Sequence, residues 1–168
     1  QAEQILEPRT AFIIRSMLQD VVKRGTARRA LELGRPDLAG KTGTTNDQID
    51  AWFSGFNDDI VASVWVGYDT LKTMGRRETG SSAALPIWVD FMQEALKASE
   101  ISQRALPSGM VSARIDPASG LLAHPDQNNA IFEIFREENV PTEMAVPERR
   151  IIDDSSETGT QQSPELLF

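Results

Sequence analysis

The stretch LAGKTGTTNDQIDAWFSGFNDDIVASVWVGY, residues 38–68, contains three short strand-like runs separated by the polar triplets NDQ and NDD. Residues 38–45 are rich in Gly and Thr, residues 51–56 carry three aromatic side chains, and residues 60–68 are dominated by Val, Ile and Trp. Asn and Asp tolerate the left-handed backbone of tight turns. The sequence therefore predicts an antiparallel meander of three strands.

A helical pattern flanks the meander on each side. Before it, apolar side chains recur with the period of one helical face over residues 8–24, which begin with a proline and end in Lys-Arg. After it, a second helical pattern covers residues 84–98, with Pro86 in its first turn and Ser82 as a candidate cap. We expect an α+β fold in which an antiparallel sheet is flanked by helices.

The pattern changes beyond residue 102. Short apolar runs at residues 110–115, 121–123 and 131–135 surround turn residues and predict a small β-rich appendage. The chain then becomes rich in Pro, Glu and Ser without periodicity, which predicts an extended or disordered acidic tail. The predicted regions are a main unit over residues 1–102, an appendage over residues 103–140 and a tail over residues 141–168.

Charge and composition exclude several classes of function. The 168 residues include 17 Lys and Arg against 25 Asp and Glu, a net charge of −8, which disfavours nucleic acid as a partner. The absence of Cys excludes disulfides and thiolate metal sites. The single histidine, His124, lies beside Pro125 and is better explained as a solvated loop residue than as part of a triad or zinc site. We expect no metal and no cofactor.

The residues Gly40-Lys41-Thr42 first suggest a phosphate-binding loop. The full motif requires a glycine five positions before Gly40, and that position holds Arg35. No hydrophobic strand precedes the segment and no helix begins directly after it, as phosphate loops require. The segment is therefore better interpreted as a strand, and nucleotide binding is disfavoured.

Lys41-Thr42-Gly43-Thr44 contains the Lys-Thr-Gly signature shared by penicillin-binding proteins and class A β-lactamases. With DAWFSG at residues 50–55 and VWVGYD at residues 64–69, it closely resembles the transpeptidase domain of class A penicillin-binding proteins. The resemblance continues in consistent order over residues 8–98. It implies the C-terminal portion of the serine acyltransferase fold that these proteins share with β-lactamases.

The resemblance also implies a reaction, peptidoglycan D,D-transpeptidation. A serine attacks the peptide bond between two D-alanines of a stem peptide, expels the terminal D-alanine and passes the acyl group to an amine. β-Lactams acylate the same serine. By motif position, Lys41 and Thr44 are the catalytic residues, the Thr44 N–H being an oxyanion donor. The resemblance also implies that Thr42, Gly43 and Thr44 bind substrate. The two threonine hydroxyls would bind its terminal carboxylate, and Gly43, having no side chain, would leave room for the substrate to approach the strand. The alternative makes Lys41 a surface cation on an edge strand.

Two motifs of this family are absent from the chain. No serine is followed three positions later by Lys or two positions later by Asn, although the reaction needs Ser-x-x-Lys and Ser-x-Asn. The sequence thus predicts a C-terminal fragment of a bifunctional protein. Its nucleophile, glycosyltransferase domain and membrane-anchoring helix would lie on an upstream part, in the same or a separate chain. The expected location is the periplasmic side of the bacterial inner membrane.

Two other functions stay open at this stage. A serine β-lactamase has the same fold, but about seventy residues follow residue 98 here, more than that enzyme needs. A non-catalytic cell-wall-binding or scaffold module would keep the strand without a nucleophile. The sequence upstream of Gln1 would discriminate between the enzyme and the binding module.

Overall fold

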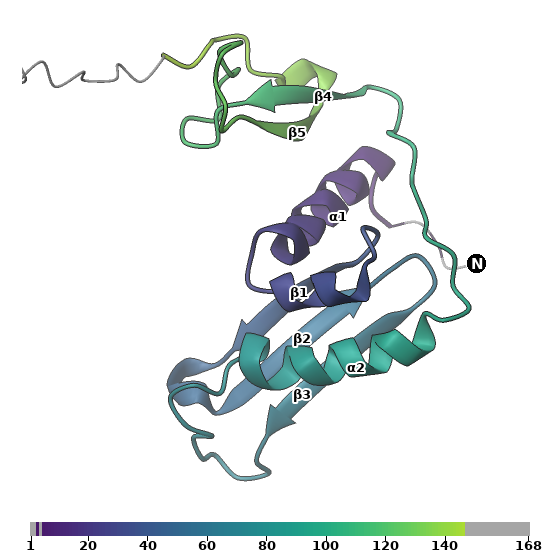
Figure 1. Cartoon of the computed structure of the whole chain (residues 1–168), viewed down its shortest axis with the longest axis vertical. Helices are drawn as coiled ribbons and strands as arrows, with labels where there is room; N and C mark the ends of the chain where they lie inside the picture. The colour runs from purple at the N-terminus through teal and green to yellow at the C-terminus, as the bar shows by residue number, and fades with distance from the viewer. Residues whose placement is uncertain (1–2, 4, 147–168) are drawn as a thin grey trace, which may run out of the picture. The chain divides into compact units, whose positions relative to one another are not determined.

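The structure is a computed structural model that describes residue 3 and residues 5–146. It contains a three-stranded sheet in the order β1-β2-β3 and a two-stranded sheet of β4 and β5 (Figure 1). The elements are α1 (Pro8–Lys23), η1 (Arg28–Leu33), β1 (Ala39–Thr44), η2 (Asn46–Gln48), β2 (Asp50–Phe56), β3 (Val61–Gly67), η3 (Gly80–Ala84), α2 (Leu85–Ala95), β4 (Met110–Ile115), β5 (Ile131–Arg136) and η4 (Glu137–Asn139).

The predicted meander is confirmed, because β1 pairs with β2 and β2 with β3, both antiparallel. In the first turn, Asp47 and Gln48 adopt left-handed φ angles of 59° and 50°. In the second turn, the Asn57 side chain accepts hydrogen bonds from the N–H groups of Asp59 and Ile60 at 3.1 and 2.8 Å. The polar triplets therefore form the two tight turns that the sequence predicts.

The core lies between the three-stranded sheet and α2, which contacts β2 and β3 (Figure 1). Ala51 and Phe53 are fully buried, and the Phe53 ring packs edge-on against Trp88 with 4.9 Å between centroids. Trp88 also donates from Nε1 to the Ala62 carbonyl at 3.1 Å. Because side chains alternate along a strand, Trp52 lies on the opposite face and is exposed.

The two main helices form where the sequence predicts them, with differences at their ends. α1 begins at Pro8, and the Glu7 side chain accepts from the Thr10 N–H at 3.1 Å. The helical segment of α2 begins earlier than expected, as the π-helical turn η3. Its cap is Thr79 rather than Ser82, because the two residues form a capping box in which each side chain accepts from the other's N–H.

The C-terminal region matches the prediction in two of its three strands. β4 and β5 are present, but residues 121–123 form no strand: Leu122 makes only single bridges, to Ile115 and to Met144. In the part of the predicted tail that is described, Ala145 donates to the Leu122 carbonyl at 2.8 Å and is buried. Residues 147–168 lie outside the described residues.

The chain divides into two compact units. Of the described residues, one unit comprises those up to residue 113 together with residues 133–140, and the other comprises residues 114–132 and 141–146. The division at residues 102 and 140 expected from composition stays a prediction. Among the described residues, no helix has the length and apolar character needed to cross a bilayer.

Candidate functional site

The strand β1, which holds the Lys-Thr-Gly signature, lies at an edge of its sheet. It pairs with β2 on one side, and no described strand pairs with its other side. In an antiparallel pair, opposite residues alternate between hydrogen-bonded and non-hydrogen-bonded positions. Thr45 donates its N–H to the Asp50 carbonyl at 3.1 Å. By this alternation, the amides of Thr42 and Thr44 point away from β2, to the open edge.

The hydroxyl of Thr44 has a fixed hydrogen-bond polarity. The backbone N–H of Gly80, at the start of η3, donates to Thr44 Oγ1 at 3.0 Å. An amide nitrogen can only donate, so the Thr44 hydroxyl accepts here and keeps its own proton for another acceptor. Thr44 is exposed, which leaves that proton accessible from solvent.

Gly80 fits this position because it has no side chain. A Cβ there would lie 2.4 Å from the Trp52 carbonyl oxygen and 2.6 Å from the Gly43 carbonyl oxygen, both backbone atoms. Gly43 itself pairs with Trp52, and its Cβ would lie 3.2 Å from the Trp52 Cβ. The absence of a side chain at Gly80 thus allows η3 to contact β1 and β2 closely, whereas the absence of one at Gly43 leaves room for the Trp52 side chain on the paired strand. Sequence reasoning assigned no role to Gly80, since nothing in its neighbours indicates this contact.

Thr42 also has a hydroxyl partner. Its Oγ1 lies 2.8 Å from Oγ1 of Thr26, which follows the end of α1. The sequence Gly25-Thr26 is typical of a helix end, and the structure shows in addition that Thr26 contacts β1. The fifteen residues between Thr26 and Thr42 carry no pattern that links these two threonines.

Lys41 is exposed on β1, and its Nζ donates to the Thr42 carbonyl at 2.8 Å. Lys41 forms no ion pair with any residue in the described part of the chain. An ammonium group carries three protons, so two remain for other acceptors. The four predicted residues, Lys41, Thr42, Gly43 and Thr44, therefore present an ammonium group, two hydroxyls and two outward amides along one strand.

The structure offers no second catalytic or metal site around His124 in the described part of the chain. His124 is 41% exposed in its side chain, and its Nδ1 lies 3.7 Å from the Asp126 carboxylate, as suits a loop residue. Among residues 3 and 5–146, no cluster of His, Cys, Asp and Glu has the arrangement of a metal site.

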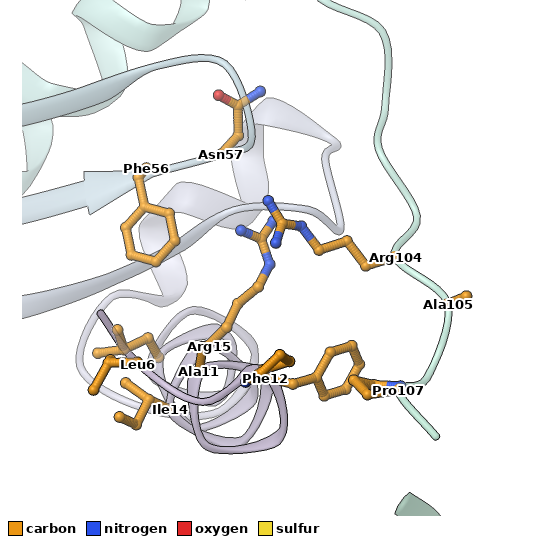
Figure 2. Close-up of a pocket in the computed structure, with 12 residues that line it drawn as sticks. Leu6, Ala11, Phe12, Ile14, Arg15, Phe56, Asn57, Arg104, Ala105 and Pro107 are labelled. Atoms are coloured by element: carbon orange, nitrogen blue, oxygen red, sulfur yellow. The ribbon is translucent and has the colours of Figure 1, made fainter. Parts of the chain in front are cut away.

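A separate pocket of about 430 Å³ lies between α1, the end of β2 and the segment around Arg104 (Figure 2). Its wall includes Arg15, which pairs with Asp58 at 2.9 Å and lies 5.5 Å above the Phe56 ring. No residue of the Lys-Thr-Gly signature lines it. The pocket is therefore distinct from the edge of β1.

Comparison with known proteins places this strand in a family. The model of the penicillin-binding protein transpeptidase domain matches residues 1–93. Penicillin-binding protein 1A of Pseudomonas aeruginosa is 58% identical over 140 residues, which cover 83% of this chain and 17% of that protein. Penicillin-binding protein 1A of Neisseria gonorrhoeae is 52% identical over 112 residues, covering 67% of this chain and 14% of that protein.

The fold agrees with that of a solved relative. The crystal structure of penicillin-binding protein 1A from Haemophilus influenzae matches 86% of this chain and 22% of its own, with a TM-score of 0.78 and 33% identity. The predicted fold class is thereby confirmed. This chain spans less than a fifth of the length of the curated relatives described above. It belongs to the penicillin-binding protein transpeptidase family, and it corresponds to part of the transpeptidase region of class A penicillin-binding proteins.

Proposed function

We propose that this chain supplies the substrate-binding strand of a peptidoglycan D,D-transpeptidase that works through a serine acyl-enzyme and is acylated by β-lactams. The observation that carries the proposal is the open edge of β1. Outward amides at Thr42 and Thr44 lie on the same strand as two threonine hydroxyls and the Lys41 ammonium, which forms no ion pair within the described part of the chain. A stem peptide binds in an extended form along such an edge, as peptides do in strand addition.

The chemistry of acyl transfer matches these groups. When the serine attacks the D-Ala-D-Ala carbonyl, an oxyanion develops, and the Thr44 N–H is placed to donate to it. The terminal carboxylate of the donor peptide takes charge-assisted hydrogen bonds from the Thr42 and Thr44 hydroxyls, beside the Lys41 charge. The missing side chain at Gly43 allows the substrate to approach the strand.

The serine and its activating lysine must come from outside this chain, since it contains no Ser-x-x-Lys. We propose an upstream part of the same protein as the source, in the same or a separate chain. Apolar side chains that are exposed on the described surface support the proposal that another part of the protein packs on this chain. Among them, Met17 is 63% exposed and Trp65 is 43% exposed. A membrane-anchoring helix, a glycosyltransferase domain and a periplasmic location at the inner membrane belong to the same proposal.

Labelling with a fluorescent penicillin tests the function. The chain alone should take no covalent label, whereas the chain combined with the part that carries Ser-x-x-Lys should yield a long-lived adduct on that serine. Rapid hydrolysis of the penicillin would favour a β-lactamase instead. Stable assembly without any adduct would favour a non-catalytic wall-binding module.

A further inference from the structure

Thr26 lies beside the proposed site without belonging to the signature strand. Its hydroxyl is 2.8 Å from that of Thr42, and either oxygen can be the donor. The backbone around it is held firmly: the Ala27 N–H donates to the Val21 carbonyl at 2.9 Å, and Ala27 is fully buried. The Thr26 side chain is therefore presented to β1 by a fixed turn.

The direction of this hydrogen bond decides what Thr42 can do. A hydroxyl donates one hydrogen bond and accepts two. If Thr42 donates to Thr26, no proton remains for a substrate carboxylate. If Thr26 donates to Thr42, the Thr42 proton is free to bind one, and a bound carboxylate selects this direction because it can only accept.

We propose that Thr26 is a positioning residue that donates to Thr42 Oγ1 and thereby turns the Thr42 proton toward the carboxylate of the stem peptide or β-lactam. This inference rests on the proposed function of β1. The hydrogen bond of Thr44 supports this proposal. Thr44 Oγ1 accepts from the Gly80 N–H, and this bond has only one possible direction because an amide nitrogen can only donate. Both strand hydroxyls thus accept from a neighbouring segment and donate outward, Thr42 from Thr26 and Thr44 from Gly80.

The test uses the complete protein, including the part that carries the serine, and two substitutions at Thr26. Thr26→Val keeps the shape of the side chain and removes the hydroxyl, while Thr26→Ser keeps the hydroxyl. Second-order acylation rates are measured with benzylpenicillin and with its methyl ester, which lacks the charged carboxylate. Thr26→Val should acylate about tenfold more slowly with benzylpenicillin and at an unchanged rate with the ester. Thr26→Ser should remain close to wild type.

Two controls separate positioning from general damage. Thr70→Val changes an exposed threonine in the loop after β3 and should alter neither rate. In a Thr42→Val background, Thr26→Val should cause no additional loss, because the group that it orients is gone. This coupling is measured against Thr42→Val alone.

The outcomes are distinct. An equal loss with benzylpenicillin and with its ester would mean that Thr26 only maintains structure, and an unchanged rate with benzylpenicillin would mean that it has no role. Either result overturns the inference and leaves the proposed function intact. A wild-type protein that benzylpenicillin does not acylate would overturn the proposed function itself, and the inference with it.

Discussion

Thr44 offers two different groups to a ligand, an outward amide and a hydroxyl that accepts from Gly80. They can be separated by substitution. Thr44→Ala removes the hydroxyl and keeps the N–H, whereas Thr44→Pro removes both. Proline is tolerated on an edge strand where the lost N–H faces away from the sheet, so the pairing with β2 should survive.

For the complete protein, we expect Thr44→Pro to reduce acylation by a β-lactam by about 10² to 10³-fold, the usual effect of losing one oxyanion donor. Thr44→Ala should cost about tenfold, because it removes a single hydrogen bond to a charged group. Stopped-flow acylation rates measure both variants. Equal rates for the two variants would refute the assignment of the Thr44 amide as an oxyanion donor.

The sequence predicts some residues of the candidate site and misses others. Lys41 to Thr44 were predicted because they are contiguous and form a recognisable signature. Thr26 and Gly80 were not, since their contacts with β1 span sixteen and thirty-six residues and involve common residue types. Such contacts depend on how elements pack, and a single sequence does not encode that packing in a local pattern.

Elements were predicted well where apolar periodicity and turn chemistry agree. The meander has Asn and Asp at both turns, and α1 has a proline at its start and a cation in its last turn. Residues 121–123 were wrongly predicted as a strand, because a run of three apolar residues fits a strand or an extended loop equally well. In the structure, Leu122 forms one isolated bridge to Ile115 and one to Met144, and no continuous strand pairing.

The segment before β1 contains a buried ion pair, and the arginine of this pair also donates a hydrogen bond to the chain that follows α2. Arg35 donates to the Asp37 carboxylate at 2.7 Å and to the Ser99 carbonyl at 2.6 Å, and the Asp37 side chain is fully buried. Burial by itself would raise the pKa of Asp37, but hydrogen bonds from the Arg35 side chain and the Ser102 N–H, together with the charge of Arg35, outweigh this effect and lower the pKa below its usual range. Asp37 therefore stabilises the fold in its ionised form.

Asp37→Asn should lower the free energy of unfolding by about 3 kcal/mol at pH 7, because Arg35 would remain buried without its counter-charge. Since the pKa of Asp37 is lowered on folding, its contribution is complete above the unfolded value near 4 and is lost progressively as the pH falls from there through the lowered pKa of the folded state. Urea unfolding at pH 7 and pH 3 measures the difference, which should shrink at pH 3. Asp69→Asn, at an exposed loop position, is the control. A difference that stays constant with pH would contradict the ion-pair account.

At the scale of the whole molecule, the described surface carries two neighbouring exposed tryptophans. Trp52 and Trp65 are 44% and 43% exposed, with ring centroids 6.3 Å apart on the face of the sheet away from α2. The third tryptophan, Trp88, is fully buried in the core between the sheet and α2. The proposed upstream part would cover the exposed pair and leave Trp88 unaffected.

Fluorine NMR can follow this burial directly. With 5-fluorotryptophan in this chain and an unlabelled upstream part, the Trp52 and Trp65 resonances should shift between H₂O and D₂O in the free chain, and the Trp88 resonance should not. On assembly, the two exposed resonances should lose their solvent isotope shift, because water is excluded from an apolar interface. Trp52→Phe and Trp65→Phe variants assign the signals. If both resonances kept their solvent isotope shift in a complex that a penicillin acylates, the upstream part would bind elsewhere, and this face would remain open to water in the active protein.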